Sequence, residues 1–443
     1  MANNIVDGMK FVGISSIERH SPTRVYDLEV DVDHEFYVNG FLGHNCIAKL
    51  HPHGDLSVYD AMMKMAGIKS ASGGPNDPWF QRRAPEPCVW GAGNIGSSEK
   101  QAAAMRYTEA KLSQYAATML LDPEYLAVMP MLPNFDDTQQ EPMLLPAKVP
   151  NVLVNGAFGI AVGVTANIPT FTLESVKKCS ALALQGKLTN GLLAKHLEFN
   201  FADGGAVSKE DVKAIVDGTA TSFMVSAPVK WDGKKLSTNV ILPGVKISKM
   251  LDLLGHDEKT ARVADETGPE GVELVAYPVK LSPFEIDKWV SRVQAKLVAK
   301  QHVKINLTVR KIGGSVEFKS VSILDIFEAW AKWRIILEKK VVKNRIARTE
   351  AAKRNQEILL LGLLNFAVFE KALKVDDSEA YLVKNIKGLE LDEAKYLLDQ
   401  PMRRFKKMVQ SELTSKIKEL SAEIKAHKAH LADPVPHIVA ELK

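Results

Sequence analysis

The stretch WGAGNIGSSEKQAAAMRYTEAKL, residues 90–112, joins a glycine-rich loop to an alanine-rich segment that contains Tyr107. Ser98 and Gln101 have the spacing of a capping box, in which two side chains satisfy the first free N–H groups of a helix. The spacing therefore predicts a helix that begins at Ser98 and carries Tyr107. On composition alone, a tyrosine in such a helix is usually a packing residue.

The segment KLHPHGDLSVYDAMMKMA, residues 49–66, predicts a second helix, with Asp55 as its N-cap. Apolar residues at helical spacing are expected to form its buried face: Val58, Ala61, Met62 and Met65. His51 and His53 precede this helix and could cap a turn, hold a metal or donate to a phosphate. A His-x-His pair without a set of cysteine or carboxylate partners is a poor metal signature, so the sequence predicts no metal site.

The segment VPNVLVNGAFGIAVGVTANIP, residues 149–169, has strand-like runs, and HVKINLTVR at residues 302–310 has another. Periodicity alone favours a buried strand with glycine bulges, with Ile160 in the core. Residues 321–431 are nearly free of helix breakers and predict helix. Within them, residues 355–373 are apolar around most of the helix circumference, which indicates either a bundle core or an interface.

Length and composition set wider limits. A chain of 443 residues, 46% hydrophobic and 25% charged, predicts a globular protein of several domains. It has no apolar run long enough to cross a membrane and no signal peptide. Its three cysteines (Cys46, Cys88 and Cys179) are too few for a disulfide framework, so we expect a cytoplasmic protein. Residues 1–45 carry a net charge of −4 and residues 46–443 a net charge of +8, which suggests a polyanionic partner for the second part.

The three segments resemble the DNA-cleaving A subunits of type IIA topoisomerases, gyrase A and topoisomerase IV A. KLHPHGD is similar to the family's K-Y-H-P-H-G-D, and residues 90–112 are similar to its G-Q-G-N-F-G-S loop followed by A-A-A-M-R-Y-T-E. The resemblance implies that Tyr107 is the nucleophile, which keeps one DNA end as a phosphotyrosyl ester. It implies that Arg106 stabilises the charged transition state and that His51 and His53 donate to the attacked phosphate.

The resemblance also implies an α+β multidomain fold. We expect a winged-helix cleavage domain at 46–140, a mixed α/β tower at 141–320, and a coiled coil with dimerisation helices at 321–443. AEIKAHKAH, residues 422–430, fits the returning coiled-coil helix. Lys49 and Ile160 are expected to contact DNA, Ile160 as an apolar wedge that unstacks a base step and bends the duplex.

Two further expectations concern cofactors and partners. The sequence shows no GxxxxGK[ST] motif and no E…D-x-D set, so Mg²⁺ and ATP are expected on partner subunits that complete an ATP-dependent enzyme. No DNA-wrapping domain follows the coiled coil, which favours relaxation or decatenation over supercoiling, as in the medium subunit of a tailed-phage topoisomerase. Double-stranded DNA and a second copy of the chain are the other expected partners. The alternative is a DNA-binding, dimerising scaffold whose catalysis has decayed.

Departures from the family pattern occur at three positions, and an apparent insertion lies around residues 69–88. Leu56 stands where bacterial enzymes usually have a serine that contacts quinolones, whereas Asp60 matches their acid four residues on. Because a leucine cannot accept the drug's water-mediated bond, weak quinolone sensitivity is expected. Trp90 and Ala92 depart from the glycine loop and put its usual contacts in doubt.

The front of the chain contains a different motif, VYDLEVDVDHEFYVNGFLGHNC at residues 25–46. Its alternation of apolar and polar residues and its Asn-Gly pair predict a β-hairpin. In the final HNC, Asn45 could cyclise and cut the chain, His44 could protonate the scissile amide, and Cys46 could accept an acyl group. The whole string resembles the last two blocks of inteins, with Asp27 and His34 at their acid and imidazole positions.

This resemblance implies the C-terminal half of a split intein. A separate chain would supply the N-terminal intein half, and splicing would remove residues 1–45 and join Cys46 to the upstream protein. The precursor alone is then expected not to cleave DNA. The alternatives are an ordinary N-terminal β-hairpin and an inactive intein remnant.

Overall fold

The computed structural model describes residues 5–6, 9–10, 35–38, 41–44, 54–66, 86–96, 102–161, 164–201, 204–268, 272–310, 316–401 and 410–442. They belong to two compact units, Met1–Val58 with Pro133–Gln140, and Tyr59–Leu132 with Glu141–Lys443. The described elements mix helices with small antiparallel sheets, which confirms the predicted α+β class.

The first unit contains two short hairpins. Strands β1 (Ile5–Val6) and β2 (Met9–Lys10) pair antiparallel, as do β3 (Glu35–Val38) and β4 (Phe41–His44). The second pair flanks Asn39 and Gly40, so the hairpin predicted from the Asn-Gly pair is confirmed. Asp27, His34, Asn45 and Cys46 lie outside the described residues.

Helix α1 (Asp55–Met65) confirms the predicted helix, but its buried face differs from the predicted one. Tyr59, Met63 and Ala66 are buried, whereas Ala61 and Met65 are exposed. The true face follows the i, i+4, i+7 spacing from an aromatic residue that the pattern left out. Asp55 is the first helical residue and accepts from the N–H of Leu56, so it is not the predicted cap.

Beyond α1, the chain forms two hairpins and short helices. Strands β5 (Val89–Gly93) and β6 (Thr108–Leu112) pair antiparallel, and β7 (Met131–Pro133) pairs with β8 (Gln140–Pro142). Between them lie the π-helix η3 (Ala116–Leu120) and α2 (Pro123–Leu126). The predicted helix from Ser98 is wrong over its described part: residues 102–104 form no helix, Met105–Tyr107 is one 3₁₀ turn (η2), and β6 follows.

The next part mixes helices and strands around one core. Helix α3 (Asn151–Val154) stands where a strand was expected, and β9 (Ala157–Ala161) and β10 (Val164–Ile168) form a hairpin after it. Helices α4 (Leu173–Leu184), α5 (Asn190–His196) and α6 (Lys209–Val216) begin at side-chain caps from Thr172, Thr189 and Ser208. The predicted strand in residues 302–310 is confirmed by β17 (Asn306–Arg310), which pairs with β18 (Val316–Ser320).

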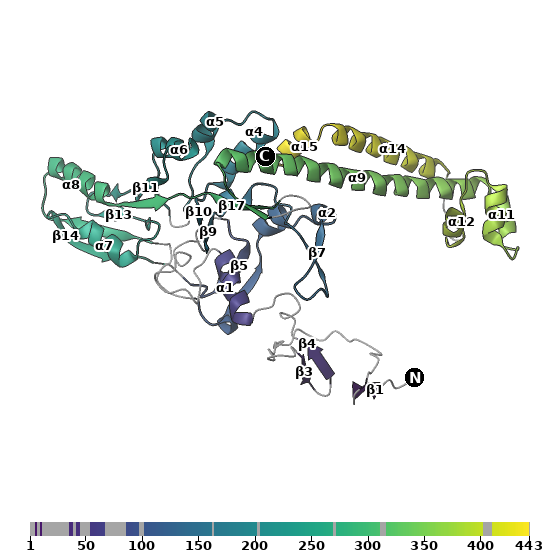
Figure 1. Ribbon diagram of the computed structural model, residues 1–443, viewed down its shortest axis with the longest axis horizontal. Coiled ribbons are helices and arrows are strands. Elements are labelled where there is room, and N and C mark those ends of the chain that lie inside the picture. Colours follow the sequence, from purple (N-terminus) through teal and green to yellow (C-terminus); the bar gives the residue numbers. More distant parts are fainter. Residues whose placement is uncertain are drawn as a thin grey trace. The chain divides into compact units, whose positions relative to one another are not determined.

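A four-stranded antiparallel sheet forms the rest of this part. Its order is β12 (Lys230–Trp231), β13 (Leu236–Thr238), β15 (Leu274–Pro278) and β14 (Thr260–Asp265). Helices α7 (Ile247–Gly255) and α8 (Pro283–Lys296) lie with this sheet, as Figure 1 shows in teal. A separate pair joins β11 (Ser222–Ser226) to β16 (Val298–His302). The indole N–H of the buried Trp289 donates to the hydroxyl of Thr260, which ties α8 to β14.

The predicted helical block is confirmed. Helix α9 (Ile323–Leu364) has 42 residues and begins at a capping box between Ser322 and Asp325, and its length is about 63 Å. Helix α14 (Gln410–Ala432) lies beside it, and α15 (Val435–Glu441) ends the described chain (Figure 1). Helices α10 (Phe366–Ala372), α11 (Ser378–Asn385) and α12 (Leu391–Leu398) form a second core at the far end of α9.

A buried polar cluster joins α9 to α2, α14 and α15, and we call it the root cluster. Arg334 is fully buried, donates to Glu441 at 2.6 Å and lies 4.0 Å over the ring of Tyr125. The Tyr125 hydroxyl donates to Glu338, and His430 lies 3.1 Å from the same carboxylate. Burial raises the pKa of Tyr125, which keeps its hydroxyl a donor. The beginning of the long helix is therefore fixed by paired buried charges as well as by apolar packing.

Candidate functional site

Tyr107 lies at the loop end of the β5–β6 hairpin, directly before β6. The register pairs Gly93 with Thr108, so the end of β5 lies against the residue that follows Tyr107. Gly93 has φ of 87°, and a Cβ there would lie 2.5 Å from the Tyr107 carbonyl oxygen. Only glycine fits this close approach and this backbone conformation, so the glycine loop positions the 3₁₀ turn.

Tyr107 is the last residue of that turn and is 64% exposed. Its N–H donates to the Ala104 carbonyl at 2.9 Å, and the Arg106 guanidinium carbon lies 4.9 Å from its ring centroid. Arg106 is exposed too. The interpretation of Tyr107 as a packing residue is therefore wrong, and the phenol and guanidinium stand together at the surface.

Tyr59 on α1 contacts the chain on both sides of this turn, the backbone before it and a side chain after it, and the sequence pattern missed it. Its hydroxyl donates to the Ala103 carbonyl at 2.7 Å and lies 3.0 Å from the Thr108 hydroxyl. The Thr108 hydroxyl donates to the Met105 carbonyl at 3.1 Å. Tyr59 is the one aromatic residue in α1 and has helical spacing with Met63, which is the signal that could have identified it.

The base of the hairpin is anchored to two other helices. The Cys88 N–H donates to the last residue of α1, Met65, and the Ser113 N–H donates to Cys88. The Asn155 side chain, after α3, exchanges two hydrogen bonds with the backbone of Glu86, each 3.0 Å long. The hairpin is therefore anchored at the end away from its loop, while Tyr107 at the loop end is exposed.

Ile160 lies on the β9–β10 hairpin, opposite Thr165, and is 70% exposed. The expectation of a core position from periodicity is wrong, because the glycine-rich run folds into a hairpin and not into a buried strand. The Asn306 side chain donates to the Thr165 carbonyl at 2.7 Å, which fixes the hairpin to β17. An exposed apolar side chain on an anchored hairpin has the form that a DNA wedge requires.

The remaining predicted residues fall in three groups. Lys49, His51 and His53 lie outside the described residues, as do four of the intein residues, Asp27, His34, Asn45 and Cys46. His44 is the last residue of β4, paired with Glu35. Leu56 is 69% exposed near the start of α1, and Asp60 follows on the same helix.

The described residues contain no group of three histidine, cysteine or acidic side chains that could hold a metal ion. Each helix in the described part of the chain is too short or too polar to span a membrane.

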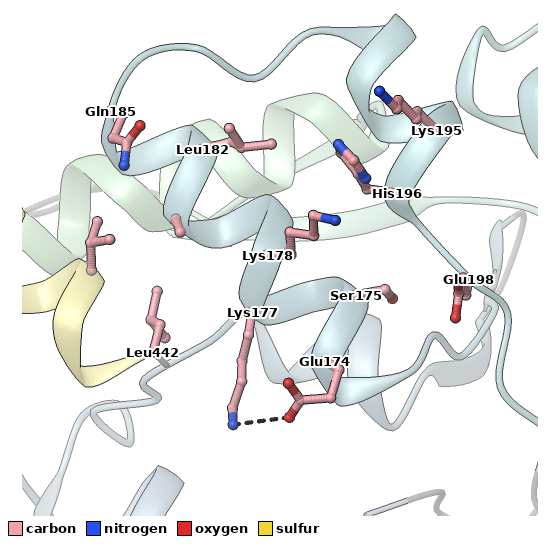
Figure 2. A pocket seen from close by; sticks show the side chains of 12 residues that line it. Glu174, Ser175, Lys177, Lys178, Leu182, Gln185, Lys195, His196, Glu198 and Leu442 are labelled. Carbon is pink, nitrogen blue, oxygen red and sulfur yellow. Dashed lines mark hydrogen bonds and ion pairs between the residues drawn. The ribbon is translucent and has the colours of Figure 1, made fainter.

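A groove of about 910 Å³ lies apart from Tyr107, between α4, α5 and α15 (Figure 2). An ion pair in it joins Lys177 to Glu174 at 3.1 Å. Burial and the nearby Lys178 and Lys195 lower the pKa of His196, so His196 tends to stay neutral there. The groove is lined by lysines, a histidine and glutamates and contains no tyrosine, so it does not offer the nucleophile predicted from the sequence.

Comparison with known proteins gives matches along most of the chain. The family model that describes the A subunit of DNA gyrase/topoisomerase IV matches residues 31–442. The A subunit of DNA topoisomerase 4 from Pseudomonas aeruginosa is 25% identical over 426 residues, covering 93% of this chain and 54% of that protein. The A subunit of DNA gyrase from Kosmotoga olearia is 26% identical over 418 residues, covering 87% of this chain and 48% of that protein. The chain thus spans about half the length of the curated relatives it matches.

Proposed function

The chain belongs to the family of DNA gyrase/topoisomerase IV A subunits, and on that premise we propose that it is the DNA breakage-reunion subunit of a type II topoisomerase. The observation that carries the proposal is the exposed Tyr107 beside Arg106 on a hairpin whose backbone is held by Tyr59 and Gly93. We propose that residues 46–140, 141–320 and 321–443 are its cleavage, tower and coiled-coil domains, and that it acts in the cytoplasm.

In the proposed step, the phenol oxygen of Tyr107 attacks a DNA phosphorus and forms a 5′-phosphotyrosyl ester. The bond from phosphorus to the 3′ oxygen breaks, the phenol loses a proton, and the leaving oxygen gains one. One phosphoester replaces another, so the reverse reaction reseals DNA without ATP. Arg106 stabilises the negative charge that develops on the phosphate oxygens, and His51 and His53 donate to the same group.

Ile160 is proposed to enter the duplex beside the cleavage site. Unstacking one base step costs a few kcal/mol, which the additional contacts of a bent duplex offset. Lys49 would bind the DNA backbone. The exposure of Ile160 and the bonds that hold its hairpin support this role.

We propose that two copies of the chain act together. Large apolar side chains are exposed at the far end of the α9–α14 pair, which favours an interface: Leu364, Leu373, Val375 and Leu391. Mg²⁺ and ATP would be held by an ATPase and metal-binding partner subunit, and strand passage would relax or decatenate DNA. Gel filtration of a Leu364→Asp/Leu391→Asp variant should show monomers, and an unchanged dimer would count against this interface.

We propose that residues 1–45 are the C-terminal half of a split intein, with Asn45, His44 and Cys46 as the splicing residues and His34 and Asp27 in support. The β3–β4 hairpin, whose last residue is His44 of the HNC motif, supports this assignment. Mixing the chain with the N-terminal intein half should release residues 1–45, and mass spectrometry should find a new peptide bond at Cys46. The alternative, an inactive remnant, predicts no ligated product.

The test of the main proposal traps a covalent DNA–protein adduct. The spliced chain, its ATPase and metal-binding partner, Mg²⁺ and supercoiled plasmid are mixed, and the reaction is stopped with detergent. We expect protein-linked, broken plasmid from the parent and from the control Tyr277→Phe, and none from Tyr107→Phe. The alternative of a decayed scaffold predicts DNA binding with no adduct from any of them.

A further inference from the structure

The face of the β5–β6 hairpin that points away from α1 carries an aromatic and cationic pair. Thr108 contacts Tyr59 of α1, so Thr108 and its partner Gly93 mark the face toward the helix. Side chains alternate along a strand, so Trp90 and Lys111, which pair directly across the hairpin, point to the other face. Trp90 is 49% exposed and Lys111 is also exposed.

The two side chains contact each other. The Lys111 ammonium lies 4.4 Å from the centroid of the Trp90 ring. Among the residues that the structure describes, no acidic side chain pairs with Lys111. A cation placed over an aromatic ring keeps N–H donors for an anion, so the indole holds the ammonium in place without neutralising it.

This pair lies close to the proposed site of DNA cleavage. Lys111 follows Tyr107 by four residues of extended chain, which is about 13 Å. A duplex advances about 3.4 Å per base pair, so this separation corresponds to about four base pairs of a duplex that runs along β6. Glu109, on the same face and nearer Tyr107, repels phosphate, which leaves Lys111 as the cationic contact of this face.

We propose that Lys111 binds a DNA backbone phosphate about four base pairs from the bond that Tyr107 attacks, and that Trp90 is a positioning residue that holds the Lys111 ammonium toward the duplex. This inference rests on the proposed function, because it takes DNA as the ligand at Tyr107. The proposed phosphate contact is Lys111, and its partner Trp90 is a position where this chain departs from the family's glycine loop.

The test measures DNA binding without cleavage, in the full chain carrying Tyr107→Phe. Fluorescence anisotropy of a labelled duplex of about 30 base pairs gives the affinity between about 50 and 200 mM salt. One phosphate contact contributes about −0.9 to the slope of log affinity against log salt, which corresponds to about eightfold in affinity at 0.1 M salt. Lys111→Gln should lose this contribution to the slope and this factor in affinity, and Lys111→Arg should keep the slope and the affinity of the parent.

Trp90 is tested by whether its effect depends on Lys111. Trp90→Ala should reduce the salt slope, Trp90→Phe should restore it, and Trp90→Ala should add nothing to Lys111→Gln. A merely structural role would weaken binding without changing the slope. Thermal unfolding of each variant shows whether the hairpin survives.

The matched control is Lys187→Gln, which removes one exposed charge near the end of α4. It should leave the salt slope unchanged. If Lys111→Gln behaves like this control, the inference is wrong while the proposed function stands. If Lys111→Gln leaves DNA binding unchanged and weakens binding of the partner subunit, the face docks a protein and the inference is likewise wrong. If the Tyr107→Phe parent does not bind DNA, both proposals are contradicted.

Discussion

Two regions of the molecule are held in opposite ways: the β5–β6 hairpin, which carries Tyr107, and the root cluster around Arg334. Tyr107 is 64% exposed, and the backbone around it is fixed by the Tyr59 hydroxyl and by the close approach of Gly93. Arg334 is fully buried and bonded to Glu441. An exposed group held through its backbone stays available to a ligand, whereas paired buried charges fix one arrangement and lose stability when a partner is removed.

Removing the central charge of the root cluster should have the largest effect. Arg334→Met removes the guanidinium beside the buried Glu338 and the bond to Glu441, and should lower the free energy of unfolding by about 3–5 kcal/mol. Chemical denaturation measures this change. Arg348→Met, an exposed arginine on the same helix, is the control and should stay within about 0.5 kcal/mol. Equal effects of the two substitutions would show that the root cluster adds no stability.

At the hairpin, Gly93→Ala should affect chemistry more than stability. The new Cβ would meet the Tyr107 carbonyl at 2.5 Å, so the 3₁₀ turn must shift. A displacement of about 1 Å can lower a rate about a hundredfold, and we expect that loss in adduct formation.

The control for this change is Gly186→Ala. Gly186 has φ of 66°, but a Cβ added there would meet nothing within 4 Å, so it carries the same backbone strain without the contact. If both substitutions left adduct formation equal, the approach of Gly93 to Tyr107 would have no role.

Tyr59→Phe should have an intermediate effect. It removes the bond to the Ala103 carbonyl, worth about 1 kcal/mol, and loosens the turn, so we expect roughly a tenfold slower adduct formation. Tyr115→Phe removes a comparable bond to Asn151 away from the turn. It should lose similar stability and keep the parent's rate. Equal rates for the two variants would contradict a positioning role for Tyr59.

The smallest expected effect concerns pH at the root cluster. Burial, together with His437, lowers the pKa of His430 below 6.5, against the opposing influence of Glu338. The unfolded chain then binds a proton that the folded chain does not, so stability is full above about pH 6.5 and falls as pH drops below it. His430→Gln should flatten the dependence of the unfolding midpoint on pH over this range. If the pH dependence of the unfolding midpoint were unchanged in this variant, it would come from titratable groups other than His430.

The sequence predicted the elements whose signals are local. The Asn39–Gly40 hairpin and the breaker-free block at 321–431 are confirmed by β3–β4 and α9–α14. Each depends on residues a few positions apart, namely a turn pair and a long run of helix formers.

The sequence did not predict contacts between residues that lie far apart along the chain. The Ser98–Gln101 capping pattern predicted a helix, but pairing with β5 makes the segment after Tyr107 a strand. The buried face of α1 was misplaced because Tyr59 packs toward a carbonyl 44 residues away. The bond from Arg334 to Glu441 spans 107 residues. No local pattern marks such partners.

The exposed Tyr107, one of nine tyrosines in the chain, is proposed to be the tyrosine that forms the covalent bond to DNA. The most direct measurement is mass spectrometry of the trapped adduct after nuclease and protease digestion. The proposed function predicts a nucleotide on the peptide that contains Tyr107, and on no other tyrosine. A nucleotide on another residue, with Tyr107 unmodified, would contradict it.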